Sequence, residues 1–203
     1  STPWQEDAHH LGLWSLPIVI GGWNEGKLCK GNSFLNEAND KNKVHIGIAW
    51  SAGSGQAPQP ERNARVRDIP VELLLSHAKR WRIRKNFPLQ SLQYGEVPNA
   101  AQQAIQEGWL KEGPQSSSWQ KTAEIVEQLK AVVTVDTAIA HLCGVLDVPC
   151  VILLNRPCDW RWGQTKEISS LYSSIRLARC KKFGLWETAL LQVEHLLHEM
   201  LGR

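Results

Sequence analysis

Residues 131–163 constrain the fold most, because two short apolar runs flank one helix-length segment there. The first run, Ala131 to Val135, is rich in β-branched residues and carries no charge, which is typical of a parallel strand covered on both faces. Asp136 and Thr137 follow at once and stand where the next segment needs the N-cap of a helix. A second apolar run, Cys150 to Leu154, predicts another strand. The stretch therefore predicts a βαβ unit.

The junction between this strand and the helix is a candidate ligand site. Ligands of open α/β sheets bind at the carboxyl ends of the strands, so we expect Asp136, Thr137, Ala138 and, one turn later, His141 to face one. A carboxylate or hydroxyl at the helix start is expected to accept the N–H groups of the first turn. Any donors left over, with the positive end of the helix dipole, attract an anion such as phosphate. The same pattern also occurs where Asp and Thr are ordinary caps and no ligand binds.

Alternating strand and helix patterns continue through the chain from Val44 onward. Strands are expected at 44–50, 89–93, 109–111, 132–136, 150–154 and 175–178, and helices at 71–79, 100–107, 122–130, 137–146 and 185–201. This alternation predicts an α/β fold with a mostly parallel sheet and helices on both faces. Residues 1–43, rich in Gly, Asn, Trp and Lys, are expected to be a linker or the remnant of an N-terminal domain, and residues 44–203 to form the main domain.

Composition excludes several classes of protein. A chain of 203 residues with 42% hydrophobic and 21% charged residues is an ordinary globular protein. No apolar run approaches the ~20 residues that cross a bilayer, and the N-terminus lacks a signal-peptide pattern, so we expect a cytoplasmic protein. The five cysteines show neither C-x-x-C nor Cys/His ligand spacing, which favours buried free thiols over disulfides or a metal site.

The net charge of +3 does not require a nucleic-acid partner. One basic run, Lys79 to Lys85, surrounds Trp81, and basic residues around an aromatic side chain are typical of single-strand binding. The run follows an amphipathic helix and precedes a strand, so we interpret it as a solvated connection and expect no nucleic-acid partner.

The loop after the first strand, Trp50 to Gly55, combines glycines and hydroxyls where a backbone can approach a ligand closely. It lacks both the dinucleotide fingerprint and the P-loop motif, which argues against a dehydrogenase or a P-loop NTPase. Arg62, Arg65 and Arg67 follow, and guanidinium groups offer forked, permanently charged donors that suit phosphate. The alternative is a solvated basic loop.

Three blocks of the chain resemble the C-terminal donor-binding domain of GT-B glycosyltransferases of the heptosyltransferase type (glycosyltransferase family 9), as found in bacterial tetratricopeptide-repeat proteins. They are VDTAIAHLCGVLDVPCVILL followed by DWRW within 135–162, VHIGIAWSAGSG at 44–55 with the arginines and Asp-Ile-Pro up to residue 70, and Ser91-Leu92-Gln93. The resemblance covers residues 44 to 180. It implies a Rossmann-like, doubly wound domain that forms one half of a GT-B fold and binds a nucleotide sugar.

The resemblance also implies a donor site. The diphosphate would lie against Asp136, Thr137, Ala138, His141, Ser51, Gly53, Arg65 and Arg67, and the base, ribose or sugar against Gln93, Tyr94, Trp160 and Arg161. The motif at 159–162 has two interpretations, ligand contact or a structural lock, and we favour the lock with one edge facing the cleft. The chain departs from the family pattern at 118–121, Ser-Trp-Gln-Lys, where relatives often carry acidic residues.

The implied activity is transfer of a sugar from a nucleotide-sugar substrate to an acceptor hydroxyl of a saccharide, lipid-linked or protein acceptor, with no cofactor. N–H donors and arginines would stabilise the charge on the leaving diphosphate without a metal. The general base of GT-B enzymes usually comes from the N-terminal domain, which residues 1–43 are too few to form. We therefore expect either the donor half of an enzyme whose acceptor domain or repeat array lies outside this chain, or a non-catalytic nucleotide-binding or assembly module.

Overall fold

The structure is a computed structural model that describes residues 43–52, 67–85, 88–114 and 118–201. Two predicted site residues, Gly53 and Arg65, lie outside these ranges, as does the predicted N-terminal segment up to residue 42.

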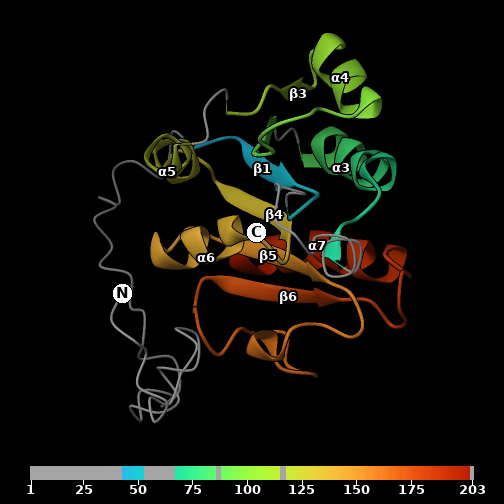
Figure 1. Cartoon of the computed structure of the whole chain (residues 1–203), viewed down its shortest axis with the longest axis vertical. Helices are drawn as coiled ribbons and strands as arrows, with labels where there is room; N and C mark the ends of the chain where they lie inside the picture. Colours follow the sequence, from blue (N-terminus) through green and yellow to red (C-terminus); the bar gives the residue numbers. More distant parts are fainter. Residues whose placement is uncertain (1–42, 53–66, 86–87, 115–117, 202–203) are drawn as a thin grey trace, which may run out of the picture.

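Six parallel strands form one sheet in the order β3-β2-β1-β4-β5-β6 (Figure 1). The strands are β1 (Ile46–Ala49), β2 (Leu89–Ser91), β3 (Leu110–Lys111), β4 (Ala131–Val135), β5 (Cys150–Leu154) and β6 (Ile175–Arg179). The helices of the described ranges are α3 (Val71–Lys85), α4 (Asn99–Gln106), α5 (Trp119–Glu127), α6 (Ala138–Val145), the short 3-10 helix η3 (Trp160–Trp162) and α7 (Glu187–Met200). The predicted α/β fold with a parallel sheet is confirmed.

Helices cover both faces of the sheet, as Figure 1 shows. On one face, α3, α4 and α7 bury residues such as Leu74 and Leu190 against Ile48 and Val133 of the strands. On the other face, α5 and α6 pack with η3 and the segment before β6, around Trp162 and the opposite side of the same strands. Because both faces are covered, β4 is buried at every position, which explains its uncharged, β-branched sequence.

The chain leaves the middle of the sheet in two directions. From β1 it adds β2 and β3 on one side, and it then returns to place β4, β5 and β6 on the other. The loops after β1 and β4 therefore diverge to opposite faces, which opens a crevice at the carboxyl ends of these two strands. Of the predicted site residues that the structure describes, Ser51 after β1 and Asp136, Thr137 and Ala138 after β4 lie at this switch point.

The basic run around Trp81 is not a solvated connection, so that prediction was wrong. The run continues α3 to Lys85, and Trp81 is buried with 4% exposure because it extends the apolar stripe of Leu74 and Ala78 at helical spacing. The Lys79 ammonium lies 5.3 Å from the centre of the Trp109 ring. A buried Trp81 cannot stack on a nucleic acid.

The four described cysteines are all free thiols, as predicted: Cys143, Cys150 and Cys180 are buried, and Cys158 is half-buried. Across the described ranges, none of the helices combines the length and the hydropathy that crossing a membrane requires.

Candidate functional site

Two pockets open at the carboxyl ends of the strands, one on each side of the end of β4. The charged pocket, of about 410 Å³, is lined by Arg67, Asp136, Leu153, Leu154, Asn155, Pro157, Cys158, Asp159 and Arg161. The aromatic pocket, of about 280 Å³, is lined by Ser51, Ala52, Leu92, Gln93, Tyr94, Pro114, Trp119, Thr122, Thr137, Ala138 and Ile139. Asp136 and Thr137 are consecutive residues, so the two pockets meet at the strand end.

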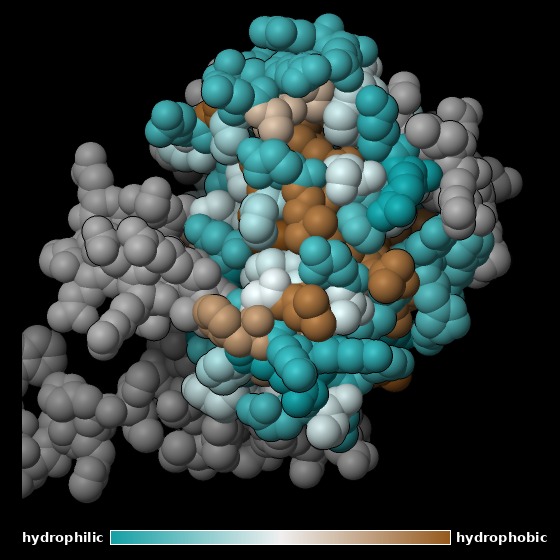
Figure 2. All heavy atoms as spheres, turned by 90° about the vertical axis from the view of Figure 1, so that its right-hand side faces the viewer, coloured by the Kyte–Doolittle hydropathy of each residue, from teal (hydrophilic) through white to brown (hydrophobic). Residues whose placement is uncertain are grey.

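Figure 2 looks onto the edge toward which β1 and β6 point in Figure 1. Hydrophobic side chains reach the surface there in a broken band between hydrophilic borders. An edge of this kind suits a ligand that has both an apolar part and a polar part.

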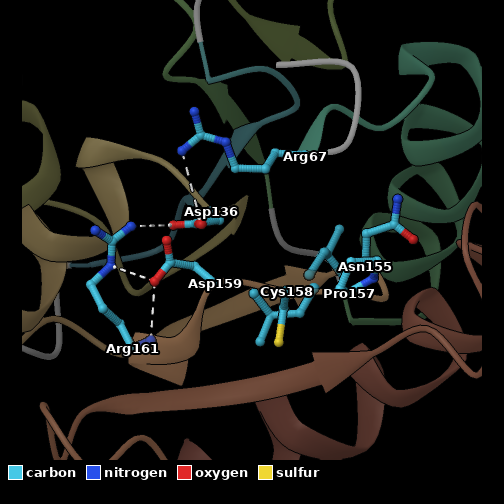
Figure 3. Close-up of a pocket in the computed structure, with 9 residues that line it drawn as sticks. Arg67, Asp136, Asn155, Pro157, Cys158, Asp159 and Arg161 are labelled. Atoms are coloured by element: carbon cyan, nitrogen blue, oxygen red, sulfur yellow. Dashed lines mark hydrogen bonds and ion pairs between the residues drawn. The ribbon is translucent and has the colours of Figure 1, made fainter. Parts of the chain in front are cut away.

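Asp136 lies between two guanidinium groups in the charged pocket (Figure 3). Its Oδ2 is 3.9 Å from Arg67 Nη1, and its Oδ1 is 3.9 Å from Arg161 Nη2. Both distances are those of ion pairs and exceed hydrogen-bond length. The Asp136 side chain is 5% exposed, and Oδ2 has no hydrogen-bond partner among the described residues. A buried carboxylate oxygen normally accepts a hydrogen bond, so this atom is suited to a donor from a ligand or a water molecule.

The segment after β5 brings Arg161 back to the end of β4. Asp159 caps η3, since its Oδ1 accepts the Arg161 N–H at 3.1 Å, and it also lies 3.3 Å from Arg161 Nε. Trp162 is 2% exposed and anchors η3 in the core. The structure agrees with the interpretation of the 159–162 motif as a structural lock with one edge, Arg161, facing the pocket.

The loop after β1 is held by two side chains from elsewhere in the chain. The Asp68 carboxylate accepts the Ser51 hydroxyl at 2.9 Å and the Ala52 N–H at 2.8 Å. Gln93 Oε1 accepts the N–H groups of Ser51 at 3.1 Å and Trp50 at 3.4 Å. Gln93, predicted to contact the ligand, therefore also sets the path of the loop.

The start of α6 differs from the prediction that a side chain caps it. Thr137 occupies the N-cap position but makes no capping hydrogen bond, because its hydroxyl pairs with the Thr134 hydroxyl at 2.9 Å. The N–H groups of the first turn therefore keep no side-chain cap, and Thr137, Ala138 and Ile139 line the aromatic pocket. An uncapped helix start carries a partial positive charge that favours an anion.

Two predicted site residues line neither pocket. His141 lies one turn into α6, where its Nδ1 is 3.1 Å from the Tyr172 hydroxyl and its ring stacks on Trp162 at 5.1 Å. Burial lowers the pKa of His141, and Arg161 lowers it further, against the opposing effect of Asp136 and Asp159. Trp160 is 49% exposed.

Sequence reasoning missed several residues that line these pockets, such as Asn155 and Trp119, and it missed Asp68, which holds the loop beside them. Asp68 stands in a block that resembles the glycosyltransferase pattern, and that block was a signal for it. Asn155 follows β5 directly, so the rule applied to the end of β4 would also have found it. Trp119 had no pattern of its own, because its place in the aromatic pocket depends on how the start of α5 packs beside the loop after β2.

The fold and the position of these pockets define an α/β domain of the kind that forms one half of a GT-B fold. Among solved structures, E. coli heptosyltransferase WaaC, determined with ADP-2-deoxy-2-fluoro heptose, matches with a TM-score of 0.54 and 17% sequence identity over 78% of this chain and 44% of that one. E. coli ADP-heptose LPS heptosyltransferase II matches with a TM-score of 0.55 and 15% identity over 81% of this chain and 53% of that one. The chain thus spans about half the length of these proteins.

No protein-family model matches the chain, and no curated protein matches its sequence. At identities this low, the structural matches establish the fold alone.

Proposed function

We propose that this chain is the donor-binding half of a GT-B glycosyltransferase and that it binds a nucleotide sugar across the carboxyl end of β4. The observation that carries the proposal is the pairing of Arg67 and Arg161 on either side of the buried Asp136. Segments distant in the sequence supply these three groups, and they converge at the switch point where doubly wound sheets bind ligands.

The chemistry of the two pockets matches the parts of such a ligand. Arg67, Arg161 and the uncapped start of α6 would bind the diphosphate, assisted by Ser51, Thr137 and Ala138. Asp136 is negatively charged and repels phosphate, so its Oδ2 is better suited to accept a hydroxyl of the sugar or ribose than to face the diphosphate directly. The structures of WaaC were determined with ADP and with ADP-2-deoxy-2-fluoro heptose, which supports a nucleoside diphosphate here.

In the proposed transfer, the bond between the anomeric carbon and the diphosphate oxygen breaks as an acceptor hydroxyl attacks. Negative charge then grows on the leaving diphosphate, and fixed guanidinium groups stabilise it without reorganising at that moment. Across the ranges that the structure describes, no His, Cys, Asp or Glu cluster has the form of a metal site.

The second candidate is a module that binds the nucleotide without transferring sugar. Both carboxylates of the charged pocket, Asp136 and Asp159, form ion pairs with Arg161, and no histidine of the described residues lines either pocket. Among the described residues, the two pockets therefore offer no histidine, and no carboxylate without an arginine partner, as the general base that transfer requires and binding does not. A transfer assay on the full-length protein separates the two candidates.

The binding proposal is tested by calorimetric titration of the purified chain with ADP, UDP, GDP and CMP. We expect one nucleoside diphosphate to bind, and Arg67→Ala and Asp136→Ala to weaken it, the arginine variant by about 10-fold or more since hydrogen bonds to charged groups contribute ~1.5–3 kcal/mol. Arg80→Ala is the matched control, since Arg80 is an exposed arginine of α3 that lines neither pocket. If the folded chain binds none of the four nucleotides, the proposal is overturned.

A further inference from the structure

Two large aromatic side chains of the aromatic pocket remain more than half exposed in the folded chain. Tyr94 is 55% exposed and Trp119 is 57% exposed, although burial of aromatic rings is one of the larger gains available to a folding chain. They come from different parts of the chain, Tyr94 from the loop after β2 and Trp119 from the start of α5, and both line this one pocket. Two exposed aromatic rings at one opening are suited to contact a flat ligand.

The backbone of Trp119 is fixed by the capped start of its helix. Ser118 caps α5, with its hydroxyl 3.5 Å from the Lys121 N–H, and its carbonyl oxygen accepts the Thr122 hydroxyl at 3.1 Å. Thr122 is one turn after Trp119, so the two residues lie on the same side of the helix, and both line the pocket. The cap fixes the backbone that carries the ring, so the ring is presented at the pocket from a defined position of the helix.

Gln93 adds a directional polar group to the same pocket. Its Oε1 is already occupied by the N–H groups of Trp50 and Ser51, and this fixes which way the carboxamide is turned. The side chain therefore offers its two Nε2 protons, and it can recognise an acceptor such as a ring nitrogen, a carbonyl oxygen or a ribose oxygen.

We infer that Trp119 and Tyr94 form a stacking site for the base of the nucleotide, with Gln93 donating to an acceptor on the base or ribose. This inference rests on the proposed function, because the charged pocket would hold the diphosphate of the same molecule. The pockets meet at Asp136 and Thr137, so a nucleotide can cross the end of β4 with its phosphates on one side and its base on the other. Aromatic rings stack on any base, so Trp119 determines how tightly the nucleotide binds, and Gln93 contributes the selectivity.

The test compares three ligands on the wild-type chain and on Trp119→Ala: the tightest-binding nucleoside diphosphate, its nucleoside, and inorganic pyrophosphate. We expect the variant to bind the nucleoside diphosphate between about 5-fold and 100-fold more weakly, as losing one stacked aromatic ring does elsewhere. Binding of pyrophosphate should not change. Trp119→Phe should retain most of the affinity, because phenylalanine keeps a stacking face.

Phe183→Ala is the matched control, since Phe183 is an aromatic residue that is 63% exposed and lines neither pocket. Unchanged binding of the nucleoside diphosphate by Trp119→Ala would overturn the stacking site while the proposed function stands. An equal loss for pyrophosphate would also overturn it, because Trp119 would then act through the fold. If the wild-type chain binds none of the three ligands, the proposed function fails as well.

Gln93 is tested by Gln93→Glu, which has nearly the same shape. One carboxylate oxygen can still accept the two loop N–H groups, whereas the other replaces two donors with an acceptor. We expect Gln93→Glu to bind the nucleoside more weakly than the wild-type chain does. Its stability in urea should be nearly that of the wild-type chain. Equal binding of the nucleoside by this variant and the wild-type chain would remove Gln93 from the site.

Discussion

The Asp68 carboxylate and the Ser51 hydroxyl are joined by a hydrogen bond of 2.9 Å, and the other Asp68 oxygen accepts the Ala52 N–H at 2.8 Å. The end of the loop that leaves β1 is therefore tied to its beginning by one side chain. The pocket-lining backbone of Ser51 and Ala52 depends on a residue that itself lines neither pocket.

Asp68→Ala should lower the free energy of unfolding by about 1–3 kcal/mol, because two hydrogen bonds to a charged, partly buried group are lost. It should also weaken nucleotide binding, since Ser51 and Ala52 are no longer held. Urea denaturation measures the first effect and calorimetry the second. Glu127→Ala, which removes an exposed carboxylate of α5, serves as the control, and a similar small change in both variants would contradict the role given to Asp68.

Gly144 of α6 lies directly against the ring of Tyr172, and a Cβ at this position would overlap the ring atoms. Gly144→Ala should therefore destabilise the chain by about 1–3 kcal/mol, as overpacking of a core does, although alanine is the better helix former. In a Tyr172→Ala background the same substitution should cost little or should stabilise. Urea denaturation of the four proteins of this cycle gives the coupling energy, and a value near zero would show that the ring moves aside freely.

Stability should fall as the pH falls, because burial lowers the pKa values of His141, His77 and His45 below their ordinary value of 6.5. The unfolded chain then binds more protons than the folded chain once the pH falls below about 7. The histidines' contribution to the free energy of unfolding is fully present above this pH. It is lost as the pH falls through 6.5 toward the folded-state pKa values, and it does not change further below those values.

The urea midpoint of the wild-type chain is therefore expected to decline between about pH 7 and about pH 5. His141→Asn should decline less over the same interval, since it lacks one of the three groups. Identical slopes for the two proteins would show that protonation of His141 does not oppose folding.

The thiols should differ sharply in reactivity toward an aromatic disulfide reagent. Cys143, Cys150 and Cys180 are buried, and burial raises the pKa of Cys150 well above its usual range and the pKa of Cys180 to about 11. Cys158 is half-buried and lines the charged pocket, with its sulfur 3.3 Å from Arg179 Nη1.

In a Cys29→Ser background, we expect one thiol to react rapidly and a bound nucleoside diphosphate to slow that reaction. Cys158→Ser should remove the fast phase. Fast labelling that persists in the Cys158 variant, or that saturating nucleotide does not slow, would contradict the placement of the ligand beside this residue.

The alternation of strands and helices was predictable because it follows from burial. β4 and β5 are covered on both faces and therefore lack charge along their whole length, which leaves a pattern that a sequence can show. The start of α5 was predicted three residues late, since Trp119 to Lys121 carry no apolar periodicity and the Ser118 cap was not recognised.

The two-pocket arrangement was not predictable from the motif at 135–141. Asp136 and Thr137 are adjacent, but successive residues at a strand end point to opposite sides, so one enters the charged pocket and the other the aromatic pocket. The partners of Asp136 come from the loop after β1 and from η3. No local pattern in the sequence predicts that these two segments meet at the end of β4.

The sheet consists of two groups of three strands, β1 to β3 and β4 to β6, which follow one another in the chain. The pairing of β1 with β4 joins these two groups. A nucleotide that contacts Ser51 and Gln93 on one side and Asp136 and Arg161 on the other would cross this seam and tie the two groups together. Saturating ligand would then do more than raise the midpoint of unfolding by mass action. It should most strongly protect from hydrogen exchange those amides of β1 and β4 that face each other, Ile48 with Val133 and Ala49 with Thr134.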